Sequence, residues 1–310
     1  MSLRTSTLAS HESGLTNLQA RQREMASAQD RLTSGKRVQR ASDDPTAAAR
    51  AERALVTLSR TESDMRALEA SQNAMTLTEQ ALGDAGELLQ QGREVMVAAG
   101  NASYSAGERK ALAVRLDGIR TQLLAIANRT DETGNYLFFP SWSGPGVPMV
   151  DGGPGVGVST SAGASTERLT AAREQMPINV DGRAAWRVDP GTGESALFKG
   201  LDDAVAELKS DTPSLTPTQI AAAGLTSADE SFTTLNLLRA RVGELLNRGD
   251  AIGGRLADLR LFAQTERSSA EDLDMVQAIS EFQGRQTSYD AALKTYSMVQ
   301  RMSLFDYIKT

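Results

Sequence analysis

Few side chains in this sequence are of the kinds that carry out nucleophilic or metal-dependent chemistry. His11 is the only histidine in 310 residues, and cysteine is absent. Histidine-based triads, multi-histidine metal sites and thiolate ligands are therefore excluded. Acidic residues are plentiful, but they fall on the polar faces of predicted helices, which is more typical of a solvated surface than of paired catalytic carboxylates. We predict that the protein is not an enzyme and has no catalytic, cofactor-binding or metal site.

Two glycine-containing segments resemble parts of phosphate-binding loops. Ser34-Gly35-Lys36 matches the end of a P-loop, but that motif needs glycine at position 30 and serine or threonine at position 37. Those positions hold Asp30 and Arg37, so the match fails. The glycines of residues 152–157 lack the preceding strand and following helix of a dinucleotide site. We expect residues 152–158 to form a turn or loop.

The acidic pair Asp43-Asp44 stands directly before Pro45. A carboxylate at a helix N-cap accepts hydrogen bonds from free backbone N–H groups, and proline suits the first helical position because no N–H is needed there. The alternative is a metal pair, but no further ligands are near in the sequence. We predict a helix cap formed by Asp44 and Pro45.

Composition and charge exclude several classes of partner. The net charge is -6. The first fifty residues carry an excess of basic side chains, but no aromatic residue lies among them to stack on bases. We expect no nucleic-acid partner. No apolar run is long enough to span a membrane, and the N-terminus lacks the apolar core of a signal peptide. The protein is therefore expected to be cytosolic or exported without a cleaved signal, with no membrane partner.

Apolar residues recur at helical spacing in the two flanks of the chain. Residues 12–34 carry a stripe with glutamine at two of its six positions, so this helix needs a partner surface to be ordered. Residues 45–99 keep a heptad along their whole length, which predicts a long helix. Further helices are predicted over residues 105–131, from a capping box at Ser227-Glu230 onward, and over residues 271–308.

The middle of the chain has a different composition. Eight of the nine prolines and both tryptophans fall there. Residues 136–139 look like a strand, residues 178–183 look like a strand running into a turn, and a short helix is expected around residues 201–208. The predicted fold is mainly α, with a long antiparallel bundle or coiled coil formed by the terminal segments and a small β-containing inserted domain.

We divide the chain into three predicted parts. Residues 1–44 and 271–310 form a terminal coiled-coil assembly domain, residues 45–139 and 227–270 form a helical domain, and residues 140–226 form a surface domain. The interrupted stripes of the two ends match one another and favour contacts with neighbouring copies. The predicted assembly interface consists of Leu15, Leu18, Met25, Leu32, Ile279, Phe282, Tyr289, Leu293, Tyr296, Met302, Leu304 and Phe305.

The flanks contain six distinctive motifs, at residues 32–38 (LTSGKRV), 42–45 (SDDP), 128–131 (NRTD), 134–138 (GNYLF), 291–293 (AAL) and 303–308 (SLFDYI). These motifs resemble the flagellin family of bacterial flagellar proteins, and in particular its junction type. The resemblance covers residues 1–139 and 227–310. At Phe139-Pro140 the chain departs from the family, which usually has glycine soon after this point.

The resemblance implies a structural adapter that joins the flagellar hook to the filament. It implies export in unfolded form by the flagellar type III apparatus, a cytosolic export chaperone and an extracellular place in the flagellum. It also implies a ring of like subunits in contact with an adjacent hook-associated junction protein and with flagellin. Two alternatives remain at this point: a variant flagellin that forms the filament itself, and another coiled-coil protein secreted by a type III system.

Overall fold

The computed structural model is mainly helical, as predicted. Only the backbone is described for residues 2–11, 168–171, 174–175 and 299–308. The structure describes residues 2–132, 134–139, 142, 146–152, 155–158, 168–171, 174–177 and 179–308.

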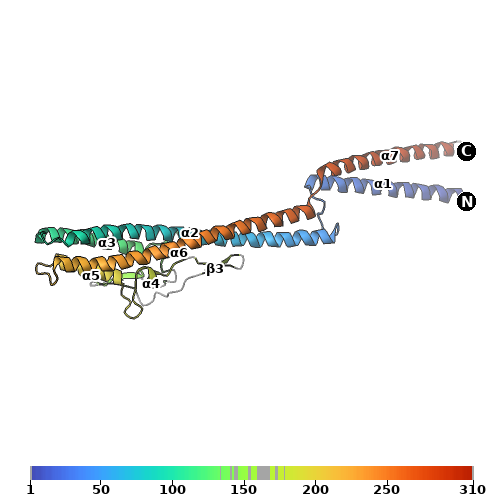
Figure 1. The fold of residues 1–310 in the computed structure, drawn as a ribbon. Coiled ribbons are helices and arrows are strands. Elements are labelled where there is room, and N and C mark those ends of the chain that lie inside the picture. Colours follow the sequence, from blue (N-terminus) through green and yellow to red (C-terminus); the bar gives the residue numbers. More distant parts are fainter. Residues whose placement is uncertain are drawn as a thin grey trace. The chain divides into compact units, whose positions relative to one another are not determined.

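Long helices occupy both flanks, and short strands lie in the middle (Figure 1). The strands form two antiparallel pairs, β1 with β2 and β3 with β4. In order, the elements are α1 (Ser2–Ser34), α2 (Pro45–Ala99), α3 (Ala106–Ala127), β1 (Met149–Asp151), β2 (Val156–Val158), β3 (Arg168–Ala171), β4 (Glu174–Pro177), α4 (Gly182–Ala185), α5 (Ala196–Lys209), α6 (Pro217–Glu271) and α7 (Met275–Ile308).

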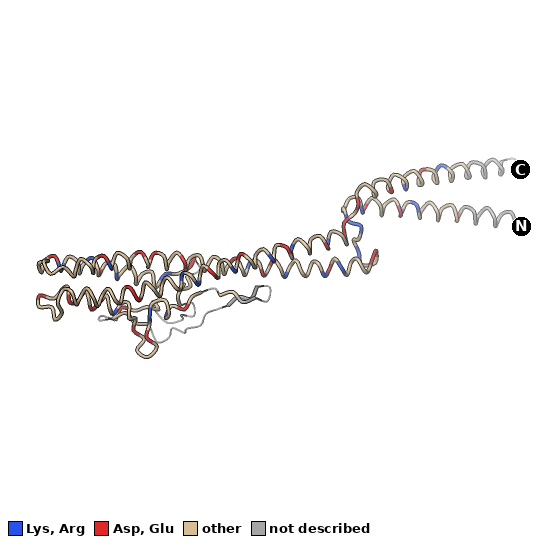
Figure 2. The backbone as a smooth tube through the Cα atoms, viewed as in Figure 1, with Lys and Arg blue, Asp and Glu red and all other residues tan. Residues whose placement is uncertain are grey.

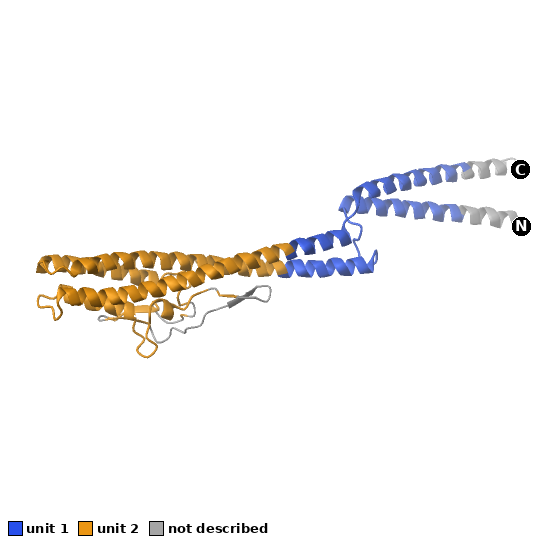
Figure 3. Ribbon diagram, in the orientation of Figure 1, with its two compact units in different colours: residues 1–60, 259–310 blue, residues 61–258 orange. Residues whose placement is uncertain are grey.

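The chain packs as two compact units (Figure 3). Unit 1 comprises residues 1–60 and 259–310, and unit 2 comprises residues 61–258. Helices α2 and α6 each contribute to both units. The division into three parts that we drew from the sequence stays a prediction.

Helices α2 and α6 run antiparallel through unit 2. Glycines allow close approach at two points: a Cβ atom on Gly224 would lie 2.7 Å from the sulfur of Met96, and one on Gly249 would lie 3.0 Å from Gln72. Polar cross-links occur in opposite order along the two helices, as antiparallel packing requires. They are Gln72 to Asp250 at 2.9 Å, Glu79 to Arg239 at 2.5 Å and Arg93 to Asp229 at 2.9 Å.

The heptad of α2 supplies the core of unit 2. From Met75 onward its members are almost completely buried, and α3 covers them, with Leu116 and Leu123 in the same apolar cluster. Helix α3 begins at the predicted capping box, in which Ser105 and Glu108 bond each other's backbone N–H groups. Burial of apolar surface on this scale is the main stabilising contribution to unit 2.

A buried arginine ties three elements of unit 2 together. Arg120 of α3 donates two bonds of 2.8 Å to Asp151 of β1 and also pairs with Asp202 of α5. Its side chain is 7% exposed. The Asp151 carboxylate raises the pKa of Arg120, so the guanidinium stays charged. A planar fork that bonds two carboxylates fixes the orientation of all three elements.

The prediction that α6 starts at Ser227 was wrong, because the helix begins ten residues earlier, at Pro217. Its true cap is formed by Thr216 and Gln219. Gln219 accepts from the backbone N–H of Thr216 at 3.0 Å, and Thr216 accepts from that of Gln219 at 3.3 Å. Ser227 lies inside the helix, where its hydroxyl donates to the Ala196 carbonyl oxygen.

The other corrections concern the middle of the chain. Residues 136–139 form no strand beyond one bridge between Thr130 and Tyr136. Instead Phe138 packs edge-on against Trp186 in the core. Residues 156–158, predicted as loop, form strand β2. Asn179 and Val180 are not in a strand, and Asp181 caps helix α4; Ile178 lies outside the described residues. Helix α5 confirms the helix expected around residues 201–208.

Charged residues of both signs are distributed along α2 and α6 (Figure 2). This distribution fits solvated helical faces joined by exposed ion pairs, each of which contributes about 0–1 kcal/mol.

Candidate assembly interface

The terminal helices α1 and α7 lie side by side and antiparallel within unit 1 (Figure 1). Gly14 of α1 approaches the ring of Tyr296, to which an added Cβ atom would lie at 3.2 Å. Further along, Arg285 of α7 donates to the Glu24 carbonyl oxygen at 3.2 Å. The contacting pairs are thus Gly14 with Tyr296 and Glu24 with Arg285, as expected for antiparallel helices.

This pair buries little of its apolar surface. Among the described side chains of α1 and α7, Ala278 alone is buried. Leu15 and Ile279 are each 46% exposed, and Leu293 is 44% exposed. The other predicted interface residues with described side chains are half-buried: Leu18, Met25, Leu32, Phe282, Tyr289 and Tyr296. Met302, Leu304 and Phe305 fall where only the backbone is described.

Short hydrogen bonds connect the segment that follows α1 to the segment between α6 and α7. Gly35 adopts φ +69°, a left-handed conformation that favours glycine, and its carbonyl oxygen accepts from Leu273 N at 3.0 Å. The Glu271 carbonyl oxygen accepts from Arg37 N at 2.7 Å. The Lys36 ammonium lies 2.7 Å from the Glu271 carboxylate and holds the pKa of that carboxyl below its usual value. Residues 34–37 (SGKR) therefore link the end of α1 to the segment before α7.

Asp44 stands at the start of α2 in the geometry of a helix cap. Its Oδ1 accepts from the backbone N–H groups of Thr46 at 3.1 Å and Ala47 at 3.0 Å, and its Oδ2 pairs with Arg37 at 3.2 Å. These bonds, led by the one from Ala47, lower the pKa of Asp44 from 3.8 to about 2. Pro45 is the first residue of α2.

The neighbouring carboxylate, Asp43, holds the loop before α2. It accepts from the backbone N–H groups of Arg40 at 3.0 Å and Gln39 at 3.2 Å, and these bonds lower its pKa. The two aspartates therefore bond to different backbone segments. The sequence predicted the Asp44 cap but not the role of Asp43. A helix cap bonds to residues that follow it, whereas the partners of Asp43, Gln39 and Arg40, precede it.

Within the part of the chain that the structure describes, no group of three or more histidine, cysteine, aspartate or glutamate residues could hold a metal ion. None of the described helices combines the length and the apolar character needed to cross a bilayer. Most exposed side chains along α1 and α7 are polar, but apolar ones such as Leu15, Ile279 and Leu293 are exposed among them. Such a surface is suited to packing against other helices.

The sequence is similar to those of bacterial flagellar proteins. Residues 5–142 match the bacterial flagellin N-terminal helical region. The chain is 28% identical to flagellar hook-associated protein 3 of Salmonella typhimurium over 305 residues, which cover 94% of this chain and 95% of that protein. It is 24% identical to flagellin of Bacillus subtilis over 269 residues, with 82% of each chain covered. The resemblance to the flagellin family and to its junction type is confirmed.

The fold has a solved counterpart. A flagellar hook-associated protein of Vibrio parahaemolyticus superimposes with a TM-score of 0.66 and 19% identity, over 74% of this chain and all of that one. At this identity the likeness concerns the fold alone, and it supports the helical architecture described above.

Proposed function

We propose that this chain is a structural adapter of the bacterial flagellum that joins the hook to the flagellin filament. The observation that carries the proposal is the similarity to hook-associated protein 3 over 94% of the chain. The flagellin-type N-terminal region alone would fit any member of the family. Similarity that continues through the middle and the C-terminal flank favours the junction type.

The terminal helices supply the means of assembly. Apolar side chains of α1 and α7 that remain half-buried or exposed within one chain can be covered by the same helices of adjacent copies. Burial of this surface on contact stabilises the assembly by about 25 cal/mol per Å². The assembly is a ring of like subunits, with an adjacent hook-associated junction protein on one side and flagellin on the other.

The role is structural and not enzymatic. The chain reaches the outside of the cell through the flagellar type III apparatus, and a cytosolic chaperone holds its C-terminal segment before export. Terminal segments that gain most of their burial from neighbours are compatible with a chain that folds fully only at its place of assembly.

Truncation tests this proposal. Removing residues 1–34 or residues 285–310 should leave unit 2 folded, with a cooperative thermal transition, but should abolish incorporation into flagella and motility in a strain that lacks its own copy. The full-length chain is the positive control and should restore motility. Normal motility with either truncated chain would overturn the proposal.

A variant flagellin is the second candidate, favoured by the similarity to Bacillus subtilis flagellin. The two candidates differ in copy number, because an adapter forms one short zone while a flagellin builds the whole filament. Quantitative mass spectrometry of purified flagella should give a small number of copies per flagellum. Abundance comparable to the main filament protein would favour the variant flagellin.

A further inference from the structure

Unit 2 contains a groove that the adapter function does not use. The groove lies between helix α6 and a wall formed by Pro177 at the end of β4 and by residues of 179–184, and it has a volume of 420 Å³. This volume falls within the range of ligand-binding sites in proteins. Its apolar lining comes from Leu238, Val242 and Leu245 of α6 and from Pro177 and Val180 opposite.

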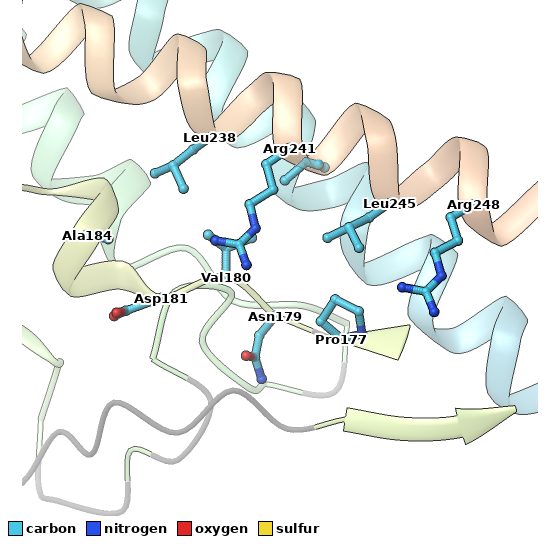
Figure 4. A pocket seen from close by; sticks show the side chains of 10 residues that line it. Pro177, Asn179, Val180, Asp181, Ala184, Leu238, Arg241, Leu245 and Arg248 are labelled. Atoms are coloured by element: carbon cyan, nitrogen blue, oxygen red, sulfur yellow. The ribbon is translucent and has the colours of Figure 1, made fainter. Parts of the chain in front are cut away.

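Two arginines of α6 project from the helix into this groove (Figure 4). Arg241 and Arg248 are seven residues apart, so they lie on one face of the helix about 10 Å apart along its axis. Arg241 forms no ion pair or side-chain hydrogen bond with the described residues, and the residue is exposed. It is therefore a free, permanently charged fork for a carboxylate.

The wall opposite α6 contains a buried polar side chain with unmet hydrogen bonds. Asn179 is 3% exposed, and neither its Nδ2 nor its Oδ1 has a partner. In Figure 4 its amide is directed away from the two guanidinium groups. A side-chain amide offers donors and an acceptor together, and the same combination is found in a peptide unit. One rotation of this side chain would present both to a segment lying in the groove.

We propose that this groove binds an extended acidic segment of a partner protein. Carboxylates of the segment would pair with Arg241 and lie near Arg248, an apolar side chain between them would contact Leu245, and its backbone would bond to Asn179. In an extended segment of polyproline II type, residues i and i+3 lie on the same face about 9 Å apart, which is close to the spacing of the two arginines. Two arginines line the groove against one carboxylate, Asp181, which already accepts from the backbone N–H of Arg183. This charge balance and the apolar lining both favour this occupant over a basic or purely polar one.

A designed peptide tests the proposal on the full-length chain. The probe is a fluorescently labelled heptapeptide with glutamate at positions 2 and 5 and leucine at position 4, and its matched control carries lysine at positions 2 and 5. Fluorescence anisotropy at low ionic strength should detect binding of the acidic peptide alone. Equal binding of the two peptides, or binding of neither, would overturn the proposal.

Variants locate the binding. Arg241→Glu should weaken binding at least tenfold, while Arg260→Glu makes the same charge change on α6 outside the groove and should leave binding unchanged. Thermal melting of both variants controls for folding. An equal loss of peptide binding in both variants would show that only the overall charge of the protein matters, and would overturn the proposed site. Glutarate that displaces the peptide at an equal concentration would replace the proposed segment with a small-carboxylate site, and so would overturn it.

Discussion

The two ends of this chain and its centre use the same helical pattern with opposite results. The heptads of α2 and α6 in unit 2 bury residues such as Met75 and Leu82 completely, whereas the pair α1·α7 leaves Leu15 and Ile279 almost half exposed. The difference lies in the number of helices: α3 covers α2 in unit 2, whereas the described parts of α1 and α7 pack mainly against each other. Heptad spacing determines which face of a helix is apolar, but a further layer determines how deeply that face is buried.

The largest expected difference between the two regions is in the rate of amide hydrogen exchange. In the dilute monomer, backbone amides of α1 and α7 should exchange at rates close to those of an unstructured peptide. Amides of α2 between Met75 and Met96 should exchange slower by a factor on the order of a thousand or more, because they open only with the core. Hydrogen exchange with mass spectrometry provides the measurement. Strong protection in both terminal helices would remove the distinction between the two regions.

Leu116→Asp probes the centre. The substitution removes a fully buried side chain and leaves a charge in the seam between helices, which should cost about 4 kcal/mol or more. The thermal midpoint of unit 2 should fall by roughly 10 °C or more, measured by circular dichroism. Val114→Asp on the same helix is the control, since Val114 is 67% exposed and its replacement should change little. An unaltered melting curve for Leu116→Asp would contradict the packing described for α3.

Arg120→Ala tests the polar part of the same core. Removing this guanidinium leaves the carboxylates of Asp151 and Asp202 without their shared partner and should destabilise unit 2 by about 2–4 kcal/mol in chemical denaturation. Arg93→Ala breaks an ion pair in which both side chains are about half exposed and should cost less than about 1 kcal/mol. Similar losses for the two variants would mean that burial does not set the strength of these ion pairs.

The smallest expected effect concerns the cap at Asp44. Its pKa is lowered from 3.8 to about 2. The charged form is therefore favoured by folding, and its stabilising contribution is complete above pH 3.8 and disappears as the pH falls towards 2. An NMR titration of the Thr46 and Ala47 amides should report this transition, and Asp44→Asn should abolish it while keeping a neutral cap. A midpoint near 3.8 would show that the cap bonds are not formed in solution.

The sequence predicted the long helices well where their ends carry strong local signals. Asp44-Pro45 and Gly100 bound α2, and the structure places the helix at Pro45–Ala99. The start of α6 was missed because Ser227 and Glu230 have the spacing of a capping box, while the actual cap uses Gln219 in place of glutamate. The sequence therefore offered two possible capping boxes, at Thr216–Gln219 and at Ser227–Glu230. Ser227 instead packs against Gly200 of α5, a contact that a local sequence pattern does not reveal.

The middle of the chain and the link between Lys36 and Glu271 depend on long-range contacts, which local sequence patterns do not reveal. The apolar run at residues 136–139 has strand-like composition, but Phe138 and Phe139 are placed by the core around Trp186. Short apolar runs are ambiguous for this reason. The importance of Lys36 is evident only with Glu271 in place, 235 positions away. The assembly residues were proposed from spacing alone, and their contacts with other copies stay a prediction.

The pairing of α2 with α6 also bears on when this polypeptide can acquire its structure. Arg50 meets Glu266 across 216 positions of chain, and the other links between these helices likewise join the first third of the sequence to the last. Contacts of such separation form late, because a large loop must close before they are made. In a polypeptide that passes through a narrow channel from either end, α2 and α6 could therefore not pair until most of its length had emerged.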